Sequence, residues 1–201
     1  MKITTFQTGY LEVNTSILVD GDKAIAIDPG ANAERIAEEV FRQNASLKEI
    51  WLTHAHFDHI GAIPELLKRF PDAVVYMHPG DKPLLGDGRN RFEPEYPFIE
   101  RLEKVADCRE LSAVKTIETP GHSPGGVCYY LESEKVLFSG DTLFFESYGR
   151  TDFPGGDFHL LQESFRKLAE LPDDTKVIPG HGPATTIGHE KANNPMFLSH
   201  N

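Results

Sequence analysis

The chain has little cysteine, no cluster of positive charge and no long hydrophobic run. Its 201 residues include two cysteines, Cys108 and Cys128, which form no CxxC pair, so we expect free thiols and no disulfide scaffold. Lys and Arg total 20 against 31 Asp and Glu, a formal net charge of -11, and no basic run exceeds two residues. Binding to a phosphate backbone requires clustered cations, so the composition argues against a nucleic-acid partner.

Hydrophobic segments of membrane or export length are also missing. No stretch approaches 18 apolar residues, and the N-terminal segment shows neither a signal-peptide-like apolar run nor a small-residue cleavage site. We therefore expect no membrane association and a cytoplasmic location. With 39% hydrophobic and 25% charged residues and no linker, low-complexity tract or repeat, residues 1–201 are expected to form a single domain.

Short β-like runs alternate with amphipathic helical patterns along the chain. We expect strands at residues 2–7, 13–19, 23–27, 49–53, 73–77, 114–118, 127–131, 135–139 and 176–178. Helices are expected from Asn32 as N-cap to about Asn44, over 63–70, and over 159–171 with Asp157 as cap. Residues 80–107 predict a loop-rich insertion with one helix at 98–105. This alternation indicates an α/β protein whose sheets are covered by helices.

The residue types that carry chemistry concentrate in the segment Thr53-His54-Ala55-His56-Phe57-Asp58-His59. After a strand, His54 and His56 point the same way and can reach one ion, while Asp58 and His59 on the next turn can face a second. Imidazole nitrogen and carboxylate oxygen suit zinc and also iron or manganese. A site without thiolate leaves room for water, which is typical of catalytic metal sites. The alternative is an exposed polar loop without an ion.

Three later segments place a His or Asp beside glycine, just past a β-like run. They are Thr119-Pro120-Gly121-His122-Ser123-Pro124-Gly125, Phe138-Ser139-Gly140-Asp141-Thr142 and Ile178-Pro179-Gly180-His181-Gly182. Loops in such positions converge over a sheet edge. Taken singly, each segment is better explained as a turn than as a ligand-bearing loop.

As an ordered set, HxHxDH, GHSPG, SGD and GHG resemble the metallo-β-lactamase fold superfamily, and more narrowly its short glyoxalase II-like hydrolases. The resemblance covers nearly the whole chain and implies an αββα four-layer sandwich of two mixed β-sheets with helices on the outer faces. It assigns His54, His56 and His122 to a first metal, Asp58, His59 and His181 to a second, and Asp141 as the bridging carboxylate. The implied cofactors are two divalent metal ions, zinc by preference, with iron or manganese as alternatives.

Hydrolysis of a thioester such as S-lactoylglutathione is the reaction that this resemblance implies. Two metal ions about 3.5–4 Å apart acidify a bridging water and polarise a carbonyl, with Asp58 and Asp141 as the catalytic carboxylates. No serine or cysteine lies in a GxSxG context. The expected partner is thus a small-molecule thioester or ester, while the oligomeric state stays open.

Several alternatives remain within and beyond this reading. A persulfide dioxygenase of the same fold would use one iron and could dispense with the second ligand set; a hydrolase could act on another ester or a lactone; a module could bind metal without catalysis. The complete set of seven ligands disfavours the first and the last. True metallo-β-lactamases resemble the first His cluster but lack the bridging aspartate, which disfavours antibiotic hydrolysis. Because only 20 residues follow His181, we expect no C-terminal helical domain of the glyoxalase II type.

Four further residues are candidates for supporting the site or binding substrate. Asp28, in Asp28-Pro29-Gly30, either orients a ligand His or caps a turn. Tyr148, Arg150 and Asp152 lie in a segment that resembles a GR(S/T)D motif of short glyoxalase II-like and persulfide dioxygenase-like proteins. Arg150 could bind a substrate carboxylate, but we favour a pair with an acid that braces the loop.

The remaining histidines and nearby aromatic residues have weaker signals. We expect surface or capping roles for His78, His159, His189 and His200. Phe144 and Phe145 either wall the pocket or pack in the core.

Overall fold

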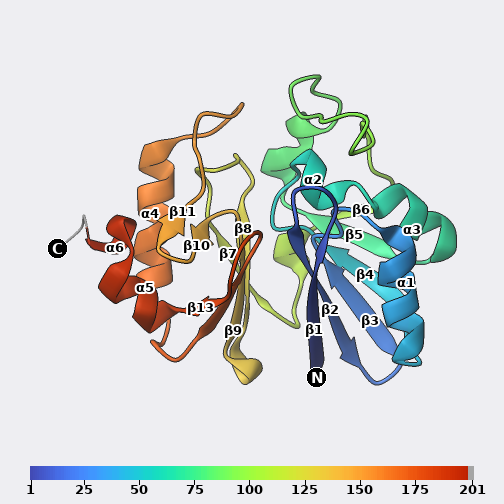
Figure 1. Cartoon of the computed structure of the whole chain (residues 1–201), viewed down its shortest axis with the longest axis horizontal. Coiled ribbons are helices and arrows are strands. Elements are labelled where there is room, and N and C mark those ends of the chain that lie inside the picture. Colours follow the sequence, from blue (N-terminus) through green and yellow to red (C-terminus); the bar gives the residue numbers. More distant parts are fainter. Residues whose placement is uncertain (199–201) are drawn as a thin grey trace.

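Two β-sheets lie face to face in the computed structural model, which describes residues 1–198 (Figure 1). The first sheet has the order β1 (Lys2–Thr8), β2 (Val13–Asp20), β3 (Lys23–Ile27), β4 (Ser46–Trp51), β5 (Val74–Met77) and β6 (Val105–Asp107). The second has the order β13 (Thr185–Thr186), β12 (Lys176–Pro179), β9 (Val136–Gly140), β8 (Val127–Leu131) and β7 (Lys115–Glu118). A separate hairpin pairs β10 (Leu143–Phe144) with β11 (Ser147–Tyr148).

Both sheets mix parallel and antiparallel pairs. In the first sheet β1, β2 and β3 are antiparallel neighbours, and β3 to β6 run parallel. In the second sheet β9 and β12 are parallel, and the other pairs are antiparallel. The carboxyl ends of the parallel strands therefore meet at one edge of the sandwich, where the loops that follow them gather.

Helices cover the outer faces of the two sheets. The first sheet carries α1 (Ala33–Arg42) and α3 (Ile63–Arg69), and the second carries α4 (Phe158–Ala169), α5 (Ile187–Asn193) and α6 (Pro195–Leu198) (Figure 1). The short α2 (Phe57–Ile60) lies at the loop edge, and 3-10 turns occur at Pro79–Leu84, Cys108–Glu110 and Glu132–Glu134. The expected αββα arrangement of two mixed sheets is confirmed. Within residues 1–198, none of the helices has the length and apolar character needed to span a membrane.

Three apolar layers hold these elements together. Ile36 and Val40 of α1 pack with the outer face of the first sheet, and Phe165 of α4 packs with the outer face of the second. Between the sheets, the fully buried ring of Trp51 lies 5.4 Å from that of Tyr129, measured between ring centroids. Burial of such large side chains is the main favourable term in folding.

One local prediction holds in position but not in side-chain contact, and another was wrong, each for a physical reason. Asn32 occupies the N-cap position of α1 as expected, but its backbone is left-handed (φ 57°) and its Oδ1 accepts from Gly9 N at 2.8 Å, so the side chain does not cap the helix. Residues 98–105 form no helix: Ile99 and Leu102 pack on the core at helix-like spacing, and Lys104 is left-handed (φ 53°). The spacing of these two apolar residues thus matched that of a buried helix face, although they reach the core through tertiary packing alone.

The cap predicted for α4 is confirmed. Asp157 Oδ1 accepts from the backbone N–H groups of His159 at 2.8 Å and Leu160 at 3.1 Å, so its carboxylate satisfies two free donors of α4.

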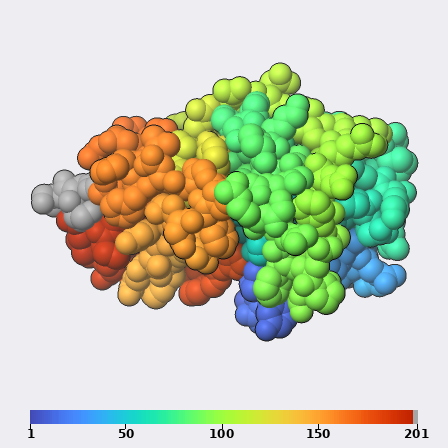
Figure 2. Space-filling model, turned by 90° about the horizontal axis from the view of Figure 1, so that it is seen from above, coloured from blue at the N-terminus to red at the C-terminus, as the bar shows by residue number. Residues whose placement is uncertain are grey.

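Seen from above, the segment near residues 150–160 (orange) lies beside the segment of residues 80–100 (green) over the loop edge (Figure 2).

Candidate metal centre

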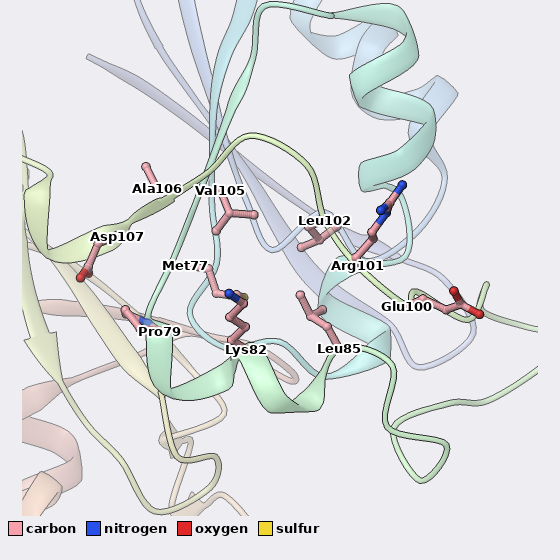
Figure 3. Close-up of a pocket in the computed structure, with 10 residues that line it drawn as sticks. All are labelled: Met77, Pro79, Lys82, Leu85, Glu100, Arg101, Leu102, Val105, Ala106 and Asp107. Atoms are coloured by element: carbon pink, nitrogen blue, oxygen red, sulfur yellow. The ribbon is translucent and has the colours of Figure 1, made fainter.

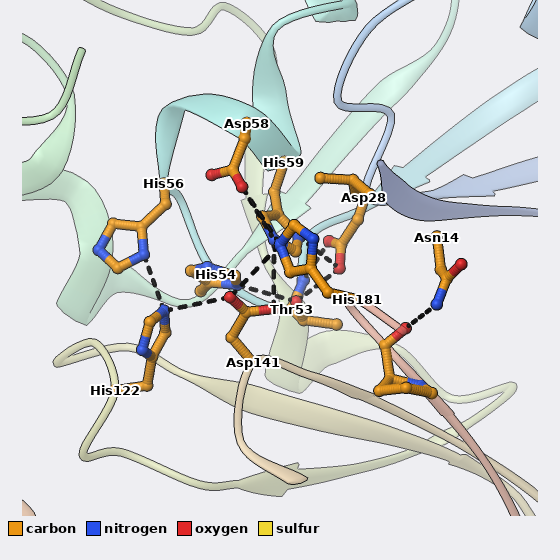
Figure 4. Close-up of polar contacts among 12 residues, drawn as sticks. Asn14, Asp28, Thr53, His54, His56, Asp58, His59, His122, Asp141 and His181 are labelled. Atoms are coloured by element: carbon orange, nitrogen blue, oxygen red, sulfur yellow. Dashed lines mark hydrogen bonds and ion pairs between the residues drawn. The ribbon is translucent and has the colours of Figure 1, made fainter. Parts of the chain in front are cut away.

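Seven side chains from the four sequence motifs meet at the loop edge (Figure 4). His54, His56, Asp58 and His59 follow β4, His122 lies between β7 and β8, Asp141 follows β9, and His181 follows β12. The first sheet thus supplies four of these residues and the second sheet three. Segments far apart in the sequence are brought together because their strands end at the same edge.

The first cluster consists of His54, His56 and His122, all buried. Each offers a ring nitrogen, and these nitrogens lie within 4.8 Å of one another. His56 Nδ1 and His122 Nε2 are only 2.9 Å apart. Three convergent imidazoles are a ligand set for a divalent ion of the zinc or iron type.

The second cluster consists of Asp58, His59 and His181, whose ligand-type atoms also lie within 4.8 Å of one another. His181 Nε2 lies 3.2 Å from Asp58 Oδ2, and His59 Nε2 lies 3.8 Å from the same oxygen. His59 is fully buried, whereas His181 is partly exposed. This cluster could hold a second cation, with a carboxylate in place of one imidazole.

Asp141 lies between the two clusters. Its Oδ1 is 3.3 Å from His59 Nε2, and its Oδ2 is 3.6 Å from both His122 Nε2 and His181 Nε2. One carboxylate therefore approaches ligands of both clusters (Figure 4). Gly180 makes this approach possible, since a Cβ at that position would lie 2.1 Å from Asp141 Oδ1.

Hydrogen bonds on the far side of the rings point the Nε2 atoms of three histidines at the site. His122 Nδ1 donates to the carbonyl of Arg150 at 2.8 Å, and His181 Nδ1 donates to that of Leu11 at 2.9 Å. His54 Nδ1 lies 3.1 Å from Thr53 Oγ1. Because a carbonyl oxygen accepts only, Nδ1 carries the proton in His122 and His181 and Nε2 keeps its lone pair.

Several buried polar atoms of the site make no hydrogen bond within residues 1–198. They are His54 Nε2, His56 Nε2, both ring nitrogens of His59, and Asp141 Oδ1. A buried polar atom left without a partner costs on the order of 1–3 kcal/mol. Lone pairs that converge in this way fit cations, which would satisfy them together.

Burial and mutual repulsion keep His54 and His56 of the first cluster uncharged. Burial, with the nearby imidazoles of His59 and His56, lowers the pKa of His54 well below its ordinary value. Burial and His122 lower the pKa of His56 to about 3. Burial also lowers the pKa of His59, but the carboxylates of Asp141 and Asp58 outweigh it and raise that pKa well above the ordinary value. His54 and His56 are thus neutral at pH 7, the form in which imidazole binds metal.

The low pKa of His56 predicts a pH dependence of stability in the metal-free protein. The folded value of about 3 lies below the ordinary 6.5, so the unfolded chain binds more protons between these values and stability falls as the pH falls through that range. A His56→Gln variant should lose this contribution, about 1.4 kcal/mol per pH unit well below pH 6.5. Urea unfolding of both chelated proteins at pH 7, 6 and 5 measures it, and equal losses in the two proteins would contradict the prediction.

Asp28 is placed behind the ligand-type histidines. Its Oδ1 accepts from Thr53 N at 2.8 Å, its Oδ2 accepts from Thr53 Oγ1 at 2.6 Å, and Oδ2 lies 3.1 Å from His59 Nδ1. Asp28, His54 and His59 are also close enough to form a three-residue cation site. The Asp28 oxygens are already occupied by donors, so the geometry favours a supporting role in orienting His59 and, through Thr53, His54.

The backbone of the segment after Asp141 contacts the site, whereas its side chains stabilise the segment itself. Arg150 Nε and Nη2 donate to the two carboxylate oxygens of Asp152, each at 2.7 Å, and its guanidinium lies 4.0 Å from the ring centroid of Phe153. This geometry favours the bracing role that we expected. Tyr148 packs its ring 6.1 Å from that of Phe158 on α4.

The other predicted histidines lie outside the clusters. His78 accepts from Gly80 N at 3.1 Å, and His189 Nε2 lies 3.0 Å from Glu146 Oε1. His159 begins α4, and His200 lies outside the described residues. Phe144 lies 6.3 Å from the His181 ring, whereas the exposed Phe145 stacks on His189 at 5.1 Å.

Two cavities differ in the side chains that line them. A cleft of about 250 Å³ opens onto both clusters and Asp141, and Leu11, Phe57, Arg150 and Phe153 complete its wall. A larger cavity of about 570 Å³ lies beside β5 and β6, and its lining combines apolar side chains with the charged residues Lys82, Glu100, Arg101 and Asp107 (Figure 3). The smaller cleft is the candidate active site because the ligand-type atoms converge there.

Sequence reasoning missed two supports of the site, the buried Asp81 and the half-buried Asn14. Asp81 accepts hydrogen bonds from both loops of the first cluster. Asn14 Nδ2 donates to the carbonyls of Pro179 at 3.0 Å and Gly182 at 2.8 Å, which fixes the loop of His181. The one available signal for Asp81 was a Gly-Asp pair after a β-strand, like that of Gly140-Asp141.

Comparison with known proteins decides the family. The model of the metallo-β-lactamase superfamily matches residues 8–181. The chain belongs to this superfamily. A hydroxyacylglutathione hydrolase GloC of Haemophilus influenzae is 37% identical over 99% of this chain and 99% of the relative. A probable metallo-hydrolase YqgX of Bacillus subtilis is 37% identical over 98% of each chain.

Solved structures of similar sequence agree with the family. A B3 metallo-β-lactamase, BLEG-1, is 37% identical with a TM-score of 0.86, covering 98% of this chain and 99% of its own. TTHA1623 in a di-iron-bound form is 36% identical with a TM-score of 0.87, covering 96% and 98%. ETHE1 from Myxococcus xanthus is 27% identical with a TM-score of 0.76, covering 99% and 89%. These three structures share the fold of this chain, and one of them is described as a metallo-β-lactamase.

Proposed function

We propose that the protein is a binuclear metal-dependent hydrolase of the short glyoxalase II-like type, acting on a thioester such as S-lactoylglutathione. The observation that carries the proposal is the pair of three-residue clusters with Asp141 between them. In this proposal the first cluster and Asp141 hold one ion, the second cluster and Asp141 hold the other, and zinc occupies both. The GloC relative supports the thioester substrate, and the di-iron neighbour supports binuclear occupancy, with iron as an alternative metal.

The two bound ions would supply Lewis acidity toward the carbonyl and a water acidified enough to act as nucleophile at neutral pH. The protein side chains then have the tasks of positioning and shielding. Asp58 and Asp141 place negative charge at the cleft, next to the ions. Hydrogen bonds to backbone carbonyls fix the tautomers of His122 and His181. Phe57 and Phe153 form an apolar wall against which a small acyl group can pack.

A mononuclear persulfide dioxygenase is the second candidate. It is supported by the likeness to ETHE1 and by the self-sufficient first cluster of three imidazoles. Iron accepts histidine and carboxylate ligands in open sites of this kind. The second cluster would have no catalytic task in such an enzyme, and its complete ligand set favours the hydrolase.

The test is S-lactoylglutathione hydrolysis by the purified protein, with bound metal measured on the same sample. We expect turnover with close to two metal ions per chain, and loss of turnover in His56→Ala. A surface variant, Lys135→Ala, serves as the matched control, because this exposed side chain lies far from the cleft and pairs with Asp174.

Other outcomes would assign another reaction. One iron per chain, no hydrolysis and oxygen uptake with glutathione persulfide would establish the dioxygenase. Two metals with hydrolysis of a lactone, another ester or a β-lactam would retain the hydrolase but replace the substrate. The β-lactam is included because BLEG-1 is described as a B3 metallo-β-lactamase.

A further inference from the structure

A buried carboxylate outside the seven ligand-type residues connects the two loops of the first cluster. Asp81 follows β5 in the turn Pro79–Leu84 and has no exposed surface. Its Oδ2 accepts from Ala55 N and from Ser123 Oγ, both at 2.9 Å, and its Oδ1 accepts from Gly125 N at 2.5 Å. A buried charge with three donors is strongly tied to its surroundings.

The donors belong to the segments that carry the imidazoles. Ala55 stands between His54 and His56, and Ser123 directly follows His122. One backbone hydrogen bond, from Val127 N to Thr53 O at 2.8 Å, also links these loops at the strand ends. Asp81 therefore provides the link at the part of each loop that presents the ring nitrogens.

Glycine keeps the space that this contact needs. A Cβ at Gly125 would lie 2.5 Å from Asp81 N and 2.9 Å from Asp81 Oδ1. A Cβ at Gly80 would lie 3.0 Å from both Gly125 Cα and Pro124 O. The Pro79–Leu84 turn and the loop of His122 are thus in close backbone contact, with the carboxylate enclosed between them.

We propose that Asp81 is a positioning residue, whose carboxylate holds the loops of His54, His56 and His122 at the separation that lets the three imidazoles bind one metal ion. The inference rests on the proposed function in one respect, namely that the first cluster binds metal. Asp81 itself reaches no ligand-type atom of the centre, so it acts through the loops and not on the reacting atoms.

Asparagine is the informative replacement because it keeps the size of aspartate. An amide has one oxygen and one NH₂ group. In one orientation its NH₂ faces the N–H of Gly125, and in the other it faces the N–H of Ala55, so a donor meets a donor in either case. The Asp81→Asn variant should therefore release one of the two loops without creating a cavity.

The test measures zinc affinity by competition with a chromophoric chelator, in full-length protein carrying His181→Ala so that the first cluster dominates binding. Loss of an outer partner of this type lowers metal affinity by about 10–100-fold. We expect a decrease of that size for Asp81→Asn and a smaller, several-fold decrease for Ser123→Ala, which removes one of the three donors. Circular dichroism melting of each protein reports its stability separately.

Glu190 provides a matched control. It is a fully buried carboxylate of α5 whose oxygens accept from Thr185 Oγ1 at 2.6 Å, Asn194 Nδ2 at 2.8 Å and Glu146 N at 2.9 Å. Glu190→Gln should lower the melting temperature by a comparable amount and leave zinc affinity within about twofold, since no loop of the first cluster depends on it.

Each outcome decides between the two proposals. Weaker zinc binding in Asp81→Asn with normal binding in Glu190→Gln supports the positioning role. Unchanged affinity in Asp81→Asn, or equal losses in both variants, would overturn the positioning role and leave the proposed function intact. Absence of zinc binding in wild-type protein would overturn both proposals together. If Asp81→Asn does not fold, unchanged affinity in Ser123→Ala overturns the inference.

Discussion

Substitution of Asp141 by asparagine is expected to lower the rate of thioester hydrolysis by about 10³-fold or more, because it removes the anionic oxygens shared by both clusters. The carboxylate approaches His59, His122 and His181 within 3.6 Å, so an amide there lacks the charge that would hold two cations close together. Bound metal should fall from about two ions per chain to one or fewer. Steady-state kinetics and metal analysis of the same preparations measure both effects.

A paired variant separates this effect from a general loss of structure. Asp174 is exposed and pairs with Lys135 away from the cleft, so Asp174→Asn should retain wild-type activity and metal content. Melting of chelated Asp141→Asn and of the chelated wild type measures the stability change separately, because the Asp141 carboxylate also faces His59 at 3.3 Å. Full activity in Asp141→Asn would remove the bridging carboxylate from the proposed mechanism.

Substitution of Trp51 by alanine is expected to have the largest effect on folding, a loss of about 3–5 kcal/mol in the free energy of unfolding. The ring is 1% exposed, lies between the sheets against Tyr129, and donates from Nε1 to Glu49 at 2.7 Å. Its removal leaves a cavity at the centre of the sandwich, directly below the strand end that leads into the His-rich segment. Equilibrium unfolding in urea measures the loss.

Phe41→Ala is the appropriate comparison for the Trp51 variant. This ring is 53% exposed at the end of α1 and touches only the edge of the core, at Phe70, with 5.4 Å between ring centroids. Its removal should therefore cost about 1 kcal/mol or less. Comparable losses in the two variants would show that the layer between the sheets contributes less than its burial implies.

Strands and helices with strong local patterns could be predicted from the sequence. The β-like runs at 13–19 and 23–27, bounded by turn signals, and the stripe through Ile36 and Val40 matched the observed β2, β3 and α1 closely. The helix predicted over 98–105 was wrong because Ile99 and Leu102 pack on the core from a segment that is not helical. Local periodicity does not distinguish that arrangement from a helical turn.

The candidate site was predictable to the extent that its pattern is local. The HxHxDH segment carries its own geometry, since a strand end followed by a helical turn directs the side chains in pairs. The partners from the second sheet, His122, Asp141 and His181, were singled out only by resemblance, because single glycine-flanked residues are ordinary turn signals. Asp81 was not predicted, since its three contacts join segments that only the folded chain brings together.

The division of ligand-type residues between the two sheets has a mechanical consequence. Both cysteines are buried and unpaired, so no disulfide ties the first half of the chain to the second. An ion that joins Asp58 and His59 to His181, or His54 and His56 to His122, would close a long loop of the chain as a reversible crosslink. The same metal–ligand bonds would then form the catalytic centre and hold the two halves of the molecule together.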